Sequence, residues 1–87
     1  MGYVHVCLRY KSQSALVTID HNCCYLKLVE TAMAEFGLDP TREVVTMNYI
    51  LSIDLPPVKI TSDSNVLSYM TLKSIDRDPS KYPINVE

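Results

Sequence analysis

Apolar and polar residues alternate along the first part of the chain. In residues 3–10 a valine or leucine stands at every second position from Val4 to Leu8. A period of two predicts a strand with one buried face. A short polar connection at 11–14 and a second apolar segment at 15–19 follow. We therefore predict that the chain begins with a β-hairpin.

The next segment has the apolar spacing of a helix. A stripe at intervals of three and four residues predicts a helix over 23–36 with this stripe in the core, formed by Leu26, Val29, Met33 and Phe36. Asn22 is the predicted N-cap, because its side-chain oxygen can accept a hydrogen bond from the first turn. Gly37 followed by Leu38 predicts a Schellman ending, in which glycine takes the left-handed backbone conformation.

Shorter elements are expected in the second half of the chain. We predict strands at 44–51 and 58–60, a short second helix at about 63–72, a surface loop at 74–82 and a closing strand at 83–87. Ser62 or Asp63 is expected to cap the second helix. In the closing strand, Ile84 and Val86 are expected to face inward.

The order of these elements predicts an α+β fold. A hairpin, a helix, two strands, a short helix and a last strand form the β-grasp, or ubiquitin-like, order. The long helix at 23–36 would cover one face of a mixed sheet of four or five strands. The first and last strands are expected to pair in parallel at its centre. Because 87 residues suit one core, residues 1–87 are predicted to form a single domain.

Charge and cysteine content narrow the classes of function. Eight basic and ten acidic residues give a net charge of −2 without a basic run, which argues against a nucleic-acid binder. No apolar stretch reaches the roughly 18 residues of a membrane span, and a strand begins at once, so no signal peptide is expected. The three cysteines, two of them adjacent, suit free thiols in a reducing, intracellular compartment better than a disulfide framework.

Catalytic and metal-binding motifs are weak in this sequence. His21, Cys23 and Cys24 lie close together, but adjacent cysteines chelate one ion poorly and no second pair follows at zinc-site spacing. A Cys–His nucleophile would also need an orienting group and a cleft. Gly2 and Gly37 are the only glycines, so a phosphate-binding loop is excluded. We expect no enzyme activity, no cofactor and no metal.

The outward face of the first strand is the candidate binding surface. Tyr3, His5, Cys7 and Arg9 share this face by the period of two. Exposed aromatic residues combined with arginine are typical anchors of protein interfaces. A plain solvated sheet face would produce the same pattern, and both interpretations stay open.

Three longer runs resemble a known protein family. They are Tyr25-Leu26 through Phe36-Gly37-Leu38-Asp39-Pro40-Thr41, the segment Leu-Pro-Pro-Val-Lys-Ile-Thr-Ser-Asp at 55–63, and the ending Asp-Arg-Asp-Pro-Ser-Lys-Tyr-Pro-Ile-Asn-Val-Glu at 76–87. Together they resemble the N-terminal domain of plant Mutator-like (MuDR family) transposases and their domesticated relatives. The resemblance covers nearly the whole chain, and its most specific parts are the Leu-Pro-Pro-Val-x-Ile-Thr block and the Lys-Tyr-Pro-Ile-x-Val-Glu ending.

The resemblance implies a Phox/Bem-like interaction module. Such modules pair head to tail, with a basic residue on the first strand against an acidic cluster near the fourth strand and second helix. Here the basic side would be Arg9, with Lys11 and His5 nearby, while Cys7 stands where the class has lysine. The acidic side would be Asp63 alone, followed by two uncharged residues. Both sides are sparse, so weak association is predicted, and a hydrophobic or β-edge contact is an equal alternative.

The expected function is therefore binding. The resemblance implies a nuclear, transposase-like protein in which this domain mediates self-association or recruits a protein partner. The catalytic segment of a transposase is a separate and much larger region. The alternative is an accessory domain that assists DNA binding, which the net charge disfavours.

Overall fold

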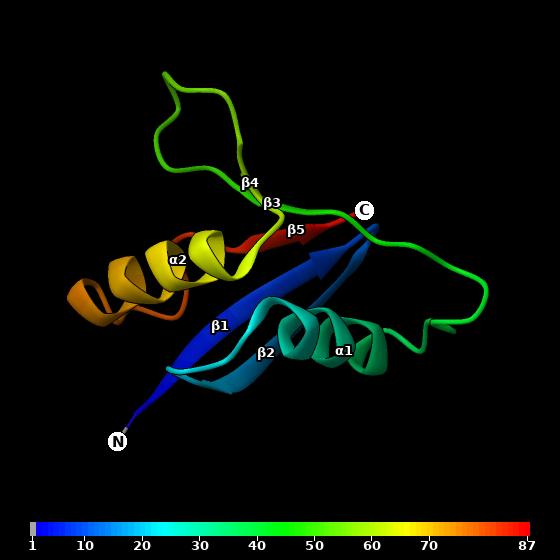
Figure 1. Ribbon diagram of the computed structural model, residues 1–87. Coiled ribbons are helices and arrows are strands. Elements are labelled where there is room, and N and C mark those ends of the chain that lie inside the picture. The colour runs from blue at the N-terminus through cyan, green and yellow to red at the C-terminus, as the bar shows by residue number, and fades with distance from the viewer. Residues whose placement is uncertain (1) are drawn as a thin grey trace.

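The computed structural model describes residues 2–87, and this range contains five strands and two helices (Figure 1). In chain order they are β1 (Tyr3–Tyr10), β2 (Gln13–Asp20), α1 (Tyr25–Glu35), β3 (Met47–Tyr49), β4 (Val58–Ile60), α2 (Asp63–Ile75) and β5 (Ile84–Val86). The predicted order of elements is confirmed.

The five strands form one mixed sheet in the order β2-β1-β5-β3-β4. β1 and β5 pair in parallel at its centre, with Leu8 opposite Ile84, and the other neighbouring strands are antiparallel. The pairing continues past the ends of β3 and β5, since the backbone groups of Thr46 and Glu87 exchange two hydrogen bonds of 2.8 Å. This is the β-grasp arrangement of an α+β domain, as the sequence predicted.

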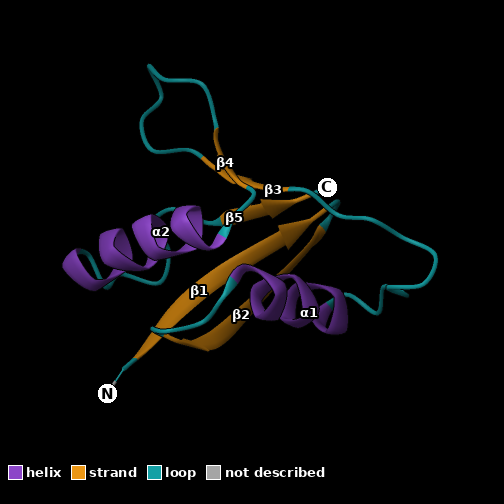
Figure 2. Ribbon diagram, viewed as in Figure 1, coloured by secondary structure: helices purple, strands orange, loops and turns teal. Residues whose placement is uncertain are grey.

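Both helices pack on the same face of the sheet (Figure 2). Tyr10 lies on the inward face of β1, and its ring is 5.4 Å from that of Phe36 at the end of α1. Tyr49 on β3 shares this face, because the register places it opposite Ile84 and thereby in line with Leu8. Its ring is 4.9 Å from that of Tyr69 on α2. The fold therefore has two layers, with helices on one side only.

The core fills the space between these layers. Its buried side chains are Val4, Val6, Leu8, Val17, Ile19, Leu28, Ala32, Met33, Val45, Met47, Tyr49, Ile60, Val66, Tyr69, Met70, Ile84 and Val86. The inward orientation predicted for Ile84 and Val86 is confirmed. Phe36 is only half-buried and packs at the rim of this core.

The predicted buried stripe of α1 is partly wrong. Leu26 is 64% exposed, and the helix buries Leu28 and Ala32 in addition to Met33, which was predicted. Both sets have helical spacing, so the period alone does not choose between them. Ala32 gives a weak hydrophobic signal in the sequence, yet its side chain is fully buried.

The two ends of α1 differ in how well the sequence predicted them. The helix begins at Tyr25, so Asn22 is not its N-cap, and the Asn22 N–H instead binds Asp20 Oδ1 at 2.8 Å. The predicted Schellman ending is confirmed. Gly37 has a φ of +66°, and the Leu38 N–H donates to the Met33 carbonyl at 2.9 Å.

In the second half of the chain, α2 is longer and β3 is shorter than predicted. α2 has 13 residues against 11 in α1, so the second helix is the longer one. Its predicted cap is confirmed, because Ser62 Oγ accepts from the Asn65 N–H at 3.3 Å. The strand predicted at 44–51 shrinks to the three residues of β3. Segments on either side of it leave the sheet, and Val44 is 92% exposed.

Candidate binding surfaces

Within residues 2–87, no helix covers the second face of the sheet, and this is called the open face below. The strand register aligns five of its side chains in one row: Ser14, Arg9, Asn85, Asn48 and Lys59. The Asn85 side-chain amide donates to Asn48 Oδ1 at 3.3 Å. An amide pair thus lies between two cations. Sequence reasoning missed Lys59, because only the register of β3, β4 and β5 aligns it with Arg9.

The predicted grouping of His5, Cys7 and Arg9 on one face of β1 agrees with the burial pattern of the strand. His5 Nδ1 is 3.2 Å from the Thr18 hydroxyl oxygen on β2. Cys7 lies opposite Leu16, whose side chain is 61% exposed. The open face is therefore mainly polar, with one exposed aliphatic residue near its β2 side.

Arg9 and Lys11 both border an open hollow of about 460 Å³, which is lined by Arg9, Tyr10, Lys11, Asn85, Val86 and Glu87. Lys11 has a φ of 53°, a left-handed conformation that side chains other than glycine rarely adopt. Its Nζ lies 5.3 Å from the centre of the Tyr10 ring, a cation–π distance. No ion pair described within residues 2–87 engages Arg9 or Lys11, so both cations are available to a ligand.

Asp63 lies apart from these residues, in the helical layer. Its Oδ1 accepts the N–H of Tyr25 at 2.7 Å, which ties the first turn of α2 to the first turn of α1. This bond supplies the cap that Cys24, the residue before α1, does not provide. Asp63 therefore has a structural role besides the binding role implied by the resemblance, and the fold places it on the opposite side of the sheet from Arg9.

The surroundings of Cys23 disfavour its thiolate. Burial raises the pKa of Cys23, and the neighbouring Cys24 and Asp20 raise it further, more than Lys27 offsets. A raised pKa disfavours the thiolate, which is the nucleophilic form. All three cysteines are free, and the part of the chain that the structure describes contains no group of three His, Cys, Asp or Glu side chains suited to a metal ion.

A projecting segment carries four exposed aliphatic side chains. The connection between β3 and β4 extends well away from the sheet (Figure 1). Within it, residues 50–55 expose Ile50 by 43%, Leu51 by 41%, Ile53 by 94% and Leu55 by 50%. We call this segment the apolar loop. Ile50 and Leu51 were assigned to the strand predicted at 44–51, and no prediction was made for Ile53 and Leu55, so this exposed segment was not predicted.

A second apolar surface lies on the outer side of α1. Because Leu26 points away from the core, it forms with later residues a groove of about 270 Å³, lined by Leu26, Val29, Glu30, Met33, Ala34, Leu38 and Pro40. The groove combines one face of the helix with the chain that follows it. Leu26 was predicted for the core and instead lines this groove, while Val29 is half-buried and both packs against the core and borders the groove.

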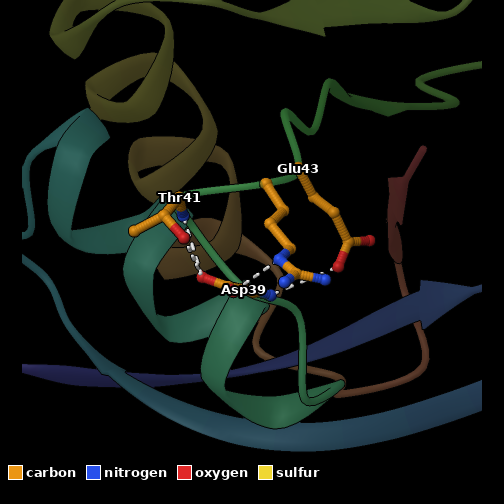
Figure 3. Close-up of polar contacts among 4 residues, drawn as sticks. Asp39, Thr41 and Glu43 are labelled. Atoms are coloured by element: carbon orange, nitrogen blue, oxygen red, sulfur yellow. Dashed lines mark hydrogen bonds and ion pairs between the residues drawn. The ribbon is translucent and has the colours of Figure 1, made fainter.

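A capped turn after α1 holds one wall of the groove (Figure 3). Asp39 Oδ1 accepts from the Thr41 hydroxyl at 2.7 Å and from the Thr41 N–H at 2.9 Å. The Glu43 N–H donates to the Asp39 carbonyl at 2.9 Å, closing a single helical turn. Arg42 adds a weak exposed ion pair of 3.7 Å with Asp39. The bonds from Thr41 lower the pKa of Asp39.

Comparison with known proteins identifies no family for this chain. No family model matches the sequence, and no curated protein matches it. Neither helix is long and apolar enough to span a bilayer, as judged over residues 2–87.

Proposed function

We propose that this chain is a non-catalytic, ubiquitin-like interaction domain that binds a second copy of itself or another protein. The observation that carries the proposal is the apolar loop, where four aliphatic side chains face solvent on a projecting segment. Soluble monomers rarely expose contiguous apolar surface of this kind unless it serves an interface. The groove on α1 is a second apolar surface suited to the same role.

The parent protein is proposed to be a nuclear, transposase-like protein on the basis of the sequence resemblance alone. In the Phox/Bem class, a basic strand of one molecule meets an acidic region of the next. The separation of Arg9 and Lys11 from Asp63 across the sheet is compatible with such pairing. With so few charges on each side, charge pairing would supplement an apolar contact and not replace it.

The test compares capture by immobilised variants. The bait is the domain, and the sources are a plant nuclear extract and a differently tagged second copy. Ile53→Asp combined with Leu55→Asp should remove the bound proteins, because charge on the apolar loop prevents its burial. Leu67→Asp is the control, since Leu67 is 61% exposed on α2, away from the loop. Identical capture by all three proteins would refute the loop as the binding surface.

DNA binding is the second candidate, and the cations of the open face favour it. Arg9 and Lys59 lie in one row, with Lys11 beside Arg9 at the hollow. If all three contacted phosphates, affinity for a duplex would fall with a log–log salt slope of about −3. The net charge of −2 opposes such binding. We expect no salt-dependent shift of a labelled duplex, and a slope near −3 that is lost on Arg9→Glu would reverse this ranking.

A further inference from the structure

β2 is an edge of the sheet and offers a long free side. It is the first strand in the order β2-β1-β5-β3-β4, and its eight residues pair with β1 in one continuous register. No bulge interrupts this register. An unpaired strand edge presents a row of N–H and C=O groups to which another strand can add.

The turn geometry identifies which groups are free. Only Lys11 and Ser12 separate the facing residues Tyr10 and Gln13, so the hairpin has a two-residue turn and its closing pair is hydrogen-bonded. Hydrogen-bonded and non-bonded pairs then alternate along the ladder. The backbone groups of Ser14, Leu16 and Thr18 therefore point away from β1, and within residues 2–87 no backbone hydrogen bond outside the ladder engages them.

This edge also lacks the usual protection against pairing. Proteins commonly guard exposed edges with lysine, proline, bulges or very short strands. β4, at the other edge, is guarded in these ways, with three residues, Pro56 and Pro57 before it and Lys59 at its centre. β2 contains no lysine, arginine, proline or glycine, and its only charged residue, Asp20, is the last.

We propose that two copies of this chain join through antiparallel pairing of their β2 strands about a two-fold axis at Leu16. The proposal deepens the proposed function, because it names a second copy as one partner and the β2 edge as the site. The two sheets would become one ten-stranded sheet. Each Ser14, Leu16 and Thr18 would then exchange backbone hydrogen bonds with the opposite strand.

The side chains of β2 are self-complementary in this register. Leu16, 61% exposed in the single chain, faces Leu16 of the second copy, and each covers the other. Ser14 faces Thr18 across the axis, and Asp20 faces Ser12 beside the Lys11 turn. No like charges meet. Because the contact is small and largely made by backbone groups, we expect a dissociation constant of roughly 10 to 1000 µM, the range of small interfaces.

Sedimentation velocity in reducing buffer, up to about 1 mM chain, tests the pairing. Leu16→Lys places two ammonium groups opposite each other and should raise the dissociation constant at least about tenfold. Leu67→Lys is the matched control, because Leu67 is also 61% exposed but lies on α2. It should leave the dissociation constant within about twofold of the unmodified chain. Equal effects of both variants would overturn the proposal.

Thr18→Pro provides an independent check on the backbone bonds. Proline at this position removes no hydrogen bond of the β1–β2 ladder, because the Thr18 N–H points away from β1, and an edge strand tolerates this change. It also removes the exposed contact of the Thr18 hydroxyl with His5 Nδ1. The variant should keep a cooperative melting transition and lose the dimer. A folded Thr18→Pro chain that still dimerises as the unmodified chain does would overturn edge pairing.

Failure of this inference is separable from failure of the proposed function. A dimer that ignores Leu16→Lys but is lost on Ile53→Asp would overturn β2 pairing and support the apolar loop. A chain that stays monomeric at 1 mM would also overturn β2 pairing. The capture experiment with loop variants then decides the proposed function separately.

Discussion

Lys73 is a fully buried lysine, and two backbone carbonyls bind its ammonium group. Its Nζ donates to the carbonyl oxygens of Asp78 at 2.8 Å and Lys81 at 3.0 Å. Burial lowers the pKa of Lys73, and the nearby carboxylates of Asp76 and Asp78 oppose this change. The side chain thus fastens the connection between α2 and β5 to the helix. No pattern in the sequence indicated the burial of this lysine.

Replacing this lysine should loosen the connection that leads to β5. We predict that Lys73→Met lowers the free energy of unfolding by about 1 to 3 kcal/mol, because two charge-assisted hydrogen bonds are lost. Lys81→Met is the control, since the Lys81 side chain is exposed, and it should change stability by less than about 0.5 kcal/mol. Urea unfolding followed by circular dichroism measures both. Equal effects would contradict the structural role of Lys73.

The lowered pKa of Asp39 predicts that the stability of the fold depends on pH. The Thr41 hydroxyl and then the Thr41 N–H hold the pKa of Asp39 below its ordinary value of 3.8. A carboxyl whose pKa is lowered by folding contributes its full stability above that ordinary value and loses it as the pH falls through the lowered folded-state pKa. Melting temperature between pH 5 and pH 2 should therefore fall less steeply in Asp39→Asn than in the unmodified chain. An identical pH profile would show that the Asp39–Thr41 bonds do not stabilise the folded state.

At the scale of elements, the helix ends marked by Gly37 and Ser62 were predicted better than the buried face of α1 and the lengths of the elements. Gly37 and Ser62 act through bonds within a few residues, so their local sequence was sufficient. The buried face of α1 is set by tertiary packing, which buries Ala32 although its side chain gives a weak hydrophobic signal. Its first turn is capped by Asp63, 38 residues later in the chain, and no local pattern contains that contact.

The orientation of α1 can be tested by two leucines of the same helix. Leu28 is fully buried, so Leu28→Ala should cost about 2 to 5 kcal/mol of unfolding free energy. Leu26 is 64% exposed, so Leu26→Ala should cost less than about 0.5 kcal/mol. Chemical denaturation of both variants measures the difference. The reverse ranking would restore the face first predicted from the sequence.

At the scale of the whole molecule, the sequence predicted the fold but only part of the binding surface. The apolar patterns in the sequence predicted the pairing of β1 with β5 and the layer of helices, and both are present in the structure. The apolar loop was missed because Ile50 and Leu51 continue the apolar pattern of the strand predicted at 44–51, whereas the pairing of β3 with β4 ends at Tyr49. The row from Arg9 to Lys59 was missed because it joins residues from four strands.

Charge pairing predicts a salt-dependent contribution to association. Arg9 makes no ion pair within the described chain, so Arg9→Glu should leave the fold intact. A head-to-tail contact of one or two rim charges contributes about 0 to 1 kcal/mol, too little to hold two chains together alone, since even a millimolar dissociation constant needs about −4 kcal/mol. Arg9→Glu and about 0.5 M salt should therefore weaken association to the same extent, because both remove only the contribution of charge pairing. Association that neither salt nor Arg9→Glu changes would exclude head-to-tail pairing.

The most direct test of the central claim, that this domain works by binding, is its mass in solution. Light scattering of the unmodified chain should be followed from about 10 µM to 1 mM in reducing buffer. Our account predicts a weight-average mass that rises with concentration from one chain toward two, since the expected dissociation constant lies in this range. A mass of one chain at every concentration would contradict self-association through either the β2 edge or the charged residues.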